Sequence, residues 1–543
     1  MLVFILFLCV IYIFQNFNLM LKNKSLGILK RIKGLSLFCF QKVKKTAVIT
    51  VLLAFCNVYH IKSQDKIEEL TMRQSIGLQY VLSLAGKHSL DAFKSKRKYG
   101  VNYWQFKSFQ SSLLPKISFE TRPLTFNRSL VKRYDSEVNI DVFRQQQSLS
   151  SYANVSMTQN IRATGTSLFI NSNFDRIINS GLSDVKSYSA TPIRIGLIQP
   201  LMAYNRFKWE KETEPLEYQI AKQEFIHEQQ AINIKTIDYF FSWALAYKRV
   251  EIAEEKKLST ARLLKIGKKR YDLGAIERDD LLNLELDVYN ANTNQTQNLQ
   301  SLQKAETALR LFLRDQIPGD IQPELPELIS DLQINIEKAK ALAQANNPDI
   351  LDLKLRKIEA SRDLDKTIKD NRFDLSVTAS YGLNQQGNTL IDAYGNLLDQ
   401  QMVSVNFSLP ILDWGERKGK IKTAQMNKDV IDIELQQDAD KLDQDIAQKV
   451  IDFNLQKELV QGTLKTSEIA KESYNITEKR FLSGKIDLLN LTSSRKVWQQ
   501  ATEQYIQSLF NYWRLYYEVQ QLTLYNFIKD KPIVEDFDAI AYD

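Results

Sequence analysis

The chain has 543 residues, 25% of them charged, and a mean hydropathy of −0.31. This length exceeds what one ordinary compact core needs, so the chain must form several domains or one very elongated body. Only 18 glycines and 11 prolines are present, which is typical of long helices because both residues interrupt them.

Residues 1–63 differ from the rest of the chain. Two hydrophobic stretches, at 1–14 and 46–56, are separated by basic residues, and acidic residues are absent. The second stretch has the layout of a secretory signal, in which basic residues precede the apolar segment TAVITVLLAFC and a polar end follows it. We predict a leader with cleavage near Ser63. The alternative is an N-terminal membrane anchor.

The formal charge of +8 comes from this leader, which holds nine basic residues. Subtracting these nine from 72 leaves 63 basic against 64 acidic residues, a formal charge of −1, so nucleic-acid binding has no electrostatic support. Cys9, Cys39 and Cys56 also lie in the leader, and only His88 and His227 remain beyond it. We therefore expect no disulfide, no metal site and no cofactor.

An internal repeat organises the remaining chain. IGLIQPLMAYNRFKWE, which begins at Ile195, aligns without gaps with VNFSLPILDWGERKGK, which begins at Val405. The same offset of 210 residues places KKRYDLGAI on EKRFLSGKI, with Gly274 on Gly484. An ungapped match across roughly eighty residues implies two copies of one structural unit.

Each copy contains segments with the alternation of β-strands. Before Pro410, apolar residues alternate with serine and asparagine in VSVNFSLP, and a similar pattern occurs in LSVTASY. The first copy has such strands between about 115 and 200, and SYANVSMTQNIRATGTSLFINSNF adds two strands around a turn at Thr164 and Gly165. One alternative is a soluble sandwich whose apolar faces pack on each other. Another is that the added segment forms a separate hairpin.

After the strands, the period becomes helical. The second copy has apolar residues at steps of three or four, and the first copy has a weaker stripe at matching positions. Arg206–Leu273 and Glu416–Ser483 each predict a helix about 100 Å long at 1.5 Å per residue. Such helices usually form coiled coils, and the polar return helices favour a wall with one wet surface.

These patterns divide the chain into five parts. We predict the leader at 1–63, a first repeat at 64–314 with its tip at Gly274, a proline-rich linker at 315–334, a second repeat at 335–527 with strands at about 374–410 and its tip at Gly484, and a tail at 528–543.

With these motifs in this order, the sequence resembles the TolC-like outer-membrane efflux proteins. The resemblance covers roughly residues 70–527 and rests on LLPKISF, IQPLMAYN, LPILDWGERKGK and the turns RYDLG and RFLSG. It implies a mixed, mainly α fold, in which coiled-coil helices form a periplasmic tunnel and β-hairpins contribute to a trimeric transmembrane β-barrel. Four strands plus two per chain would give about 18 in a trimer, where the resemblance implies about 12.

The resemblance also implies a function and partners. We expect an export channel in the outer membrane with a long periplasmic part, forming a homotrimer in contact with outer-membrane lipid. It would work with a periplasmic adaptor and an inner-membrane transporter in a tripartite efflux or type I secretion system. Pro115, Pro200, Pro410 and Gly415 would mark the strand–helix junctions.

The family's entrance residues map onto the two turns. Arg270, Tyr271 and Gly274 correspond to Arg480, Phe481 and Gly484, and the family's lock would use Asp280, but Ile486 replaces the expected basic residue. Any lock must therefore differ in chemistry. The family's acidic ring would fall on Asn490 and Ser493, so Asp487 is the candidate for a ring of three carboxylates that attracts cations. Alternatively, Asp487 only caps the following helix.

Two other classes of function are alternatives to the channel. An enzyme has little support, because the sequence lacks a nucleophile elbow, a phosphate-binding glycine loop and a metal cluster. The stronger rival is a periplasmic coiled-coil scaffold or adaptor without a pore. A scaffold does not need alternating strands in both repeats, so the strands favour the channel.

Overall fold

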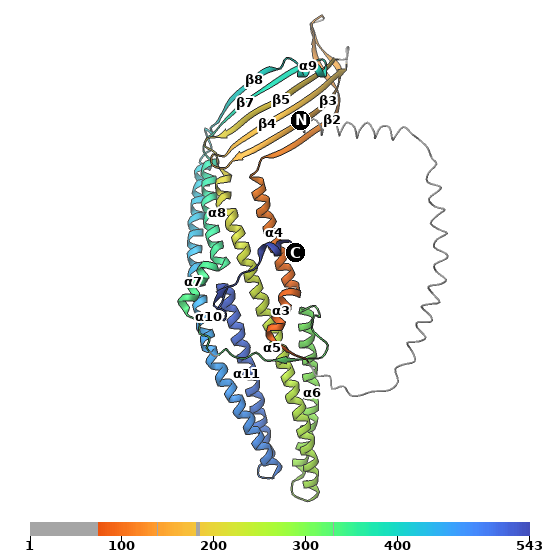
Figure 1. Ribbon diagram of the computed structural model, residues 1–543, viewed down its shortest axis with the longest axis vertical. Helices are drawn as coiled ribbons and strands as arrows, with labels where there is room; N and C mark the ends of the chain where they lie inside the picture. The colour runs from red at the N-terminus through yellow and green to blue at the C-terminus, as the bar shows by residue number, and fades with distance from the viewer. Residues whose placement is uncertain (1–73, 138, 181–184, 330, 543) are drawn as a thin grey trace, which may run out of the picture. The chain divides into compact units, whose positions relative to one another are not determined.

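The structure is a computed structural model that describes residues 74–137, 139–180, 185–329 and 331–542. The predicted leader lies outside these residues. The described part combines one large sheet with long helices, which run away from one end of the sheet (Figure 1). This mainly helical architecture with a sheet confirms the fold class expected from the sequence.

The sheet contains six strands in one meander. Its spatial order is β2-β3-β4-β5-β7-β8, and every neighbouring pair is antiparallel. The strands are β2 (Lys116–Asp135), β3 (Ile140–Ile161), β4 (Thr166–Ser180), β5 (Val185–Pro200), β7 (Asp374–Gly387) and β8 (Leu398–Ser408). The four-plus-two count predicted from the sequence is therefore present, with the added segment inside the same sheet.

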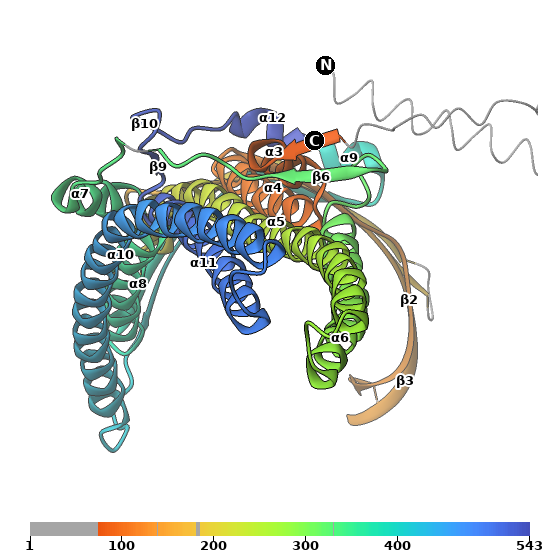
Figure 2. The same ribbon diagram turned by 90° about the horizontal axis from the view of Figure 1, so that it is seen from below.

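The repeat is visible in the helices that follow the sheet. The long helices α5 (Arg206–Asp272) and α10 (Glu416–Leu482) each have 67 residues and begin 210 positions apart. Their return helices are α6 (Arg278–Phe312) and α11 (Leu488–Thr523). Each long helix packs along its return helix, and α11 also packs on α5. Seen from below, the helices form a curved layer with α6 and α10 on opposite sides (Figure 2).

Shorter elements complete the layer. The helices are α3 (Leu78–His88), α4 (Leu90–Ser112), α7 (Ile336–Asn346), α8 (Pro348–Asp370), α9 (Leu390–Tyr394) and α12 (Phe537–Tyr542). The short strands are β1 (Gln74–Gly77), β6 (Ile321–Glu324), β9 (Tyr525–Asn526) and β10 (Lys531–Pro532). Helices α4 and α8 lead into β2 and β7, so they repeat the same helix-to-strand connection.

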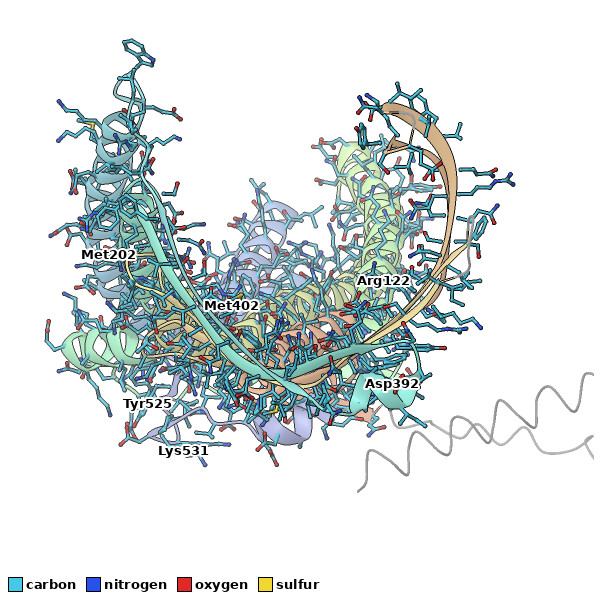
Figure 3. All side chains as sticks on the ribbon, turned by 90° about the horizontal axis from the view of Figure 1, so that it is seen from above. Arg122, Met202, Asp392, Met402, Tyr525 and Lys531 are labelled. Atoms are coloured by element: carbon cyan, nitrogen blue, oxygen red, sulfur yellow. The ribbon has the colours of Figure 1, made fainter. Side chains whose placement is uncertain are left out.

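The sheet is curved, and its two sides carry different side chains. Arg122 and Met402 lie on the concave side (Figure 3).

The extra turn between β3 and β4 is fixed to the helical part, because the Asn205 side chain donates to the carbonyl oxygen of Arg162 at 3.0 Å and also caps α5. Gly165 in this turn has φ +73°, a backbone conformation that favours glycine.

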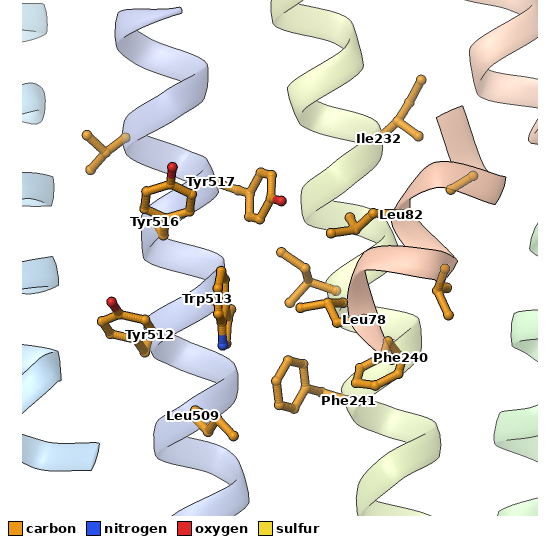
Figure 4. Packing of buried hydrophobic residues seen from close by; sticks show 14 of the residues in the cluster. Leu78, Leu82, Ile232, Phe240, Phe241, Leu509, Tyr512, Trp513, Tyr516 and Tyr517 are labelled. Carbon is orange, nitrogen blue, oxygen red and sulfur yellow. The ribbon is translucent and has the colours of Figure 1, made fainter. Parts of the chain in front are cut away.

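The core lies between α3, α5 and α11 (Figure 4). Tyr512, Trp513 and Tyr516 of α11 are buried, and Trp513 lies opposite Phe241 of α5 in this view. The aromatic residues at the end of the second repeat thus pack in the core.

The described part of the proline-rich linker, residues 315–329 and 331–334, runs across the helices (Figure 1). Its strand β6 pairs in parallel with β1. The Arg310 guanidinium donates to the carbonyl oxygens of Ile317, Pro318 and Gly319 at 3.1, 2.8 and 2.8 Å. These bonds satisfy backbone acceptors that a proline-rich segment cannot pair within a helix.

None of the described helices has a stretch that is both long enough and apolar enough to span a membrane.

Candidate channel wall and entrance

The sheet has one apolar face and one polar face. One row of cross-strand neighbours on the first face is entirely apolar and consists of Ile117, Met157, Ile170 and Ile195. A row on the opposite face is polar and consists of Glu120, Asn154, Asn173 and Thr191. Because successive side chains of a strand alternate between faces, this division follows directly from the sequence alternation. The concave side, which carries Arg122 and Met402, is the polar one (Figure 3).

Among the described residues, the short helix α9 covers one part of the apolar face, where Tyr394 stacks on Phe174 with ring centroids 6.4 Å apart, and most of this face is exposed. Ile117 and Phe119 are 71% and 64% exposed, and Val403 is 76% exposed. A soluble sandwich would bury these side chains against a second sheet. The six strands form a single sheet, which contradicts the sandwich alternative.

Both edges of the curved sheet also lack a strand partner in the described chain. Strands β2 and β8 are the outermost strands of the sheet, so each leaves one row of backbone groups without a strand partner in the described chain. The free N–H and C=O groups of an edge strand can pair with a strand of another chain.

The outer helices carry apolar residues on the side away from their partners. On α6, Leu282, Leu286 and Tyr289 are exposed, whereas Leu284 and Ala291 pack towards α5. At about 100° per residue, the exposed set lies on the opposite side of the helix. Helix α10 repeats this arrangement, with exposed Ile451, Leu455, Ile469 and Ile476 opposite its buried side. Each outer helix thus presents an apolar stripe without a partner in this chain.

The two hairpin tips are built alike. Gly274 and Gly484 have φ +66° and +76° and follow the ends of α5 and α10. In each turn the residue after the glycine donates its N–H to the arginine carbonyl five positions earlier, Arg270 at 2.8 Å and Arg480 at 3.0 Å. These bonds form a Schellman C-cap, which satisfies the free carbonyls at a helix end.

A hydrogen bond links the two tips. Arg270 Nη2 donates to the carbonyl oxygen of Leu482 at 3.4 Å, across the two repeats. The Arg480 side chain, by contrast, is exposed. The repeat-related arginines therefore have different surroundings, although their backbones match.

The family's lock residues do not form one polar cluster in this chain. Phe481 is buried and belongs to an apolar cluster with Leu284 and Leu491, against which Ile486 packs. Tyr271 is exposed, with the Arg278 guanidinium 5.9 Å from its ring centroid, and Asp280 is exposed. An apolar contact thus occupies the place of a polar link.

Asp487 caps α11. Its Oδ1 accepts hydrogen bonds from the backbone N–H of Asn490 at 2.9 Å and from the Asn490 side chain at 2.7 Å. Both residues and Ser493 are exposed. The capping role is a property of the single chain, whereas a ring would require further copies.

A buried arginine that the sequence reading did not single out joins three helices above the tips. Arg495 of α11 is 5% exposed, and its Nη2 donates to Ser259 Oγ of α5 at 2.9 Å. Ser259 Oγ donates in turn to Glu478 Oε1 of α10 at 3.2 Å, and the Arg495 guanidinium lies 5.6 Å from the Tyr474 ring centroid. We call these four residues the Arg495 network.

A further carboxyl borders this network. Partial desolvation of Glu255 on α5, together with the nearby Glu478, raises the pKa of the Glu255 carboxyl. Ser259 lies 13 residues before the end of α5, so the network is about 20 Å from the tip. Together with the Arg270 bond at the tips and the ion pair of Arg249 with Glu503, the network joins the two hairpins by polar contacts.

The strand–helix junctions use proline and a left-handed glycine. Pro115 immediately precedes β2, Pro200 ends β5, and Pro410 follows β8. Gly415 caps α10 with φ +93°. Asp413 accepts from the Arg417 side chain at 2.6 Å and from the Arg417 N–H at 3.0 Å, and these bonds lower the pKa of Asp413 to about 2.

This arrangement defines a class of protein. A curved sheet with opposite apolar and polar faces, continued by paired helices that end in glycine turns, is the fold of solved outer-membrane channels. The chain belongs to the outer membrane efflux protein family, whose model matches residues 148–313 and 341–514.

Solved structures of similar fold share little sequence with this chain. The CmeC outer membrane channel of Campylobacter jejuni has a TM-score of 0.58 at 14% identity, covering 85% of this chain and 88% of that one. VceC of Vibrio cholerae has a TM-score of 0.56 at 12% identity, covering 82% and 95%. The open state of the Neisseria gonorrhoeae MtrE channel has a TM-score of 0.51 at 16% identity, covering 82% and 88%. No curated protein sequence matches significantly.

Proposed function

We propose that this chain forms a homotrimeric channel in the outer membrane, with a long periplasmic part, through which substrates leave the cell. The observation that carries the proposal is that the sheet and the long helices form a curved wall that is open on one side (Figure 2). Both its edge strands and its two outer helices present surfaces that lack partners, and these surfaces lie on opposite sides of the curve. A head-to-tail contact repeated around an axis closes such a wall into a ring.

Closure would give each surface a suitable environment. The apolar face of the sheet would contact lipid, and the polar face would line the lumen. Closing the sheet would remove the unpaired edges, which a bilayer does not tolerate. With six strands per chain, a trimer would form a barrel of about 18 strands.

The hairpin tips would form the periplasmic entrance. There the turns at Gly274 and Gly484 would meet a periplasmic adaptor, and an inner-membrane transporter would supply substrates, as in tripartite efflux or type I secretion. The apolar cluster around Phe481 and the Arg495 network would hold the entrance closed. Asp487, exposed beside the second turn, would supply one carboxylate per chain to a cation-attracting ring.

The test is to isolate the membrane fractions and size the detergent-solubilised protein with and without heating, then to record conductance in planar bilayers. We expect an outer-membrane species of three chains that dissociates on boiling and conducts ions. Asp487→Asn should lower cation selectivity, whereas Ser493→Ala serves as the control for a neighbouring exposed position. A periplasmic monomer or dimer without conductance would instead support the scaffold.

A further inference from the structure

Basic residues interrupt the apolar face of the sheet towards the end that is farther from the helices. Moving along β2 away from the helices, this face carries Ile117, Phe119 and Phe126, and then Arg128. On β4, Arg176 follows Phe174 on the same face, and on β5 Lys186 follows Tyr188. On three of the six strands, the first charged residue of the apolar face is therefore basic.

The register places these three residues on the convex, apolar face. Arg176 pairs with Ser151, and Lys186 pairs with Ile178 of β4. Arg128 pairs with Gln147, which in turn pairs with Ser180 of β4. In this register Arg128 lies level with Ser180 of β4, four residues beyond Arg176, and Lys186 lies level with Ile178, two residues beyond it. At about 3.3 Å per residue, the three charges form a band about 13 Å deep along the strands.

The charges are available for an external ligand. Arg128 and Lys186 are exposed and form no ion pair with any residue in the described ranges. Arg176 packs its guanidinium 5.9 Å from the Tyr188 ring centroid, and its Nε is buried without a hydrogen-bond acceptor. Lys132, farther along β2, differs because Asp141 pairs with it at 2.8 Å. We call Arg128, Arg176 and Lys186 the basic belt.

We propose that the basic belt binds phosphate groups of anionic lipids in the outer leaflet of the membrane. The inference rests on the proposed function, because that function puts the apolar face in lipid and the far end of the sheet outside. Guanidinium groups bind phosphate oxygens through paired hydrogen bonds, and an ammonium adds a point charge. Near the far end of the apolar face, these groups would lie close to the depth of the headgroups, beside an interfacial tyrosine.

The experiment measures binding of fluorescent lipopolysaccharide to the purified, detergent-solubilised oligomer of the full chain. The test variant is Arg128→Gln/Arg176→Gln/Lys186→Gln. The matched control is Lys116→Gln/Arg122→Gln/Arg194→Gln, which removes three charges from the polar face of β2 and β5. A charge-preserving variant, Arg128→Lys/Arg176→Lys/Lys186→Arg, tests whether a loss reflects charge. Heat-dissociable oligomer on a gel verifies folding of each preparation.

We expect the test variant to bind lipopolysaccharide on the order of 100-fold more weakly at low salt, from about fivefold per charge near an anionic surface. The polar-face control and the charge-preserving variant should retain binding. Equal binding of lipopolysaccharide by the test variant and the unmodified protein overturns the inference. The inference is also overturned if millimolar inorganic phosphate displaces lipopolysaccharide equally well from these two proteins. Conductance is recorded on the same preparations. A protein that binds the lipid but does not conduct contradicts only the proposed channel function. A protein that conducts but shows no charge-dependent binding contradicts only the proposed role of the basic belt.

Discussion

At the scale of single residues, Arg495 is a buried side chain that joins the two hairpins. Its buried guanidinium donates to Ser259, which bonds Glu478, so one side chain connects α11 with α5 and, through Ser259, with α10. Hydrogen bonds that involve a charged group contribute more than neutral ones, because the charge strengthens the electrostatic attraction.

We predict that Arg495→Ala lowers the free energy of unfolding by about 2 kcal/mol and raises the mean conductance of the channel. The first effect is measured by thermal melting of the helical circular dichroism signal, and the second in planar bilayers. Lys496→Ala is the matched control, since its side chain is exposed on the next position of the same helix. Unchanged melting and conductance in Arg495→Ala would show that the network does not hold the hairpins together.

The Arg495 network also illustrates what the sequence could not predict. Arg495 and Ser259 are 236 positions apart and contact each other only because α5 and α11 pack side by side. No local periodicity encodes such a contact. Gly274 and Gly484 were predictable, in contrast, because a helix end in the left-handed conformation favours glycine at one fixed position.

At the scale of elements, periodicity and the repeat predicted the long helices and the six strands, because each depends on local alternation of apolar and polar residues. The length of β2 and β3 was not predicted. Their outer halves contain serine, glutamine, arginine and lysine on both faces, so the period of two is weak there. Cross-strand hydrogen bonds between the two strands, which single-strand patterns do not report, extend this hairpin.

The helix ends give an element-scale prediction with opposite signs for two glycines of one helical hairpin. Gly484 has φ +76°, so Gly484→Ala forces a side chain into the left-handed region and should destabilise the protein by about 1 kcal/mol. Gly462 lies within α10, and a Cβ there would meet no atom within 4 Å. Gly462→Ala should therefore stabilise the protein by up to about 1 kcal/mol, through helix propensity.

Thermal melting of the two variants beside the unmodified protein checks the signs. A lower melting temperature for Gly484→Ala and a higher one for Gly462→Ala are expected. Two shifts of the same sign would mean that the turn is not held in the left-handed conformation, or that Gly462 contacts another copy in the oligomer.

At the scale of the whole molecule, the exposed apolar stripes on α6 and α10 separate a ring from a free-standing scaffold. Leu286 is 57% exposed in the single chain, so Leu286→Glu puts a charge into water and should barely affect a monomer. In a closed ring the same position would face α10 of the neighbouring copy, and an unpaired charge buried there is costly.

We therefore predict that Leu286→Glu lowers the temperature at which the detergent-solubilised oligomer dissociates, without loss of helical content. Asn292→Glu introduces the same charge at an exposed position of α6 about 120° around the helix, and should leave dissociation unchanged. The measurement is gel mobility of unboiled samples across a temperature series. If both variants dissociate like the unmodified protein, the stripe on α6 does not form the contact between copies, and closure of the wall must depend on the sheet edges alone.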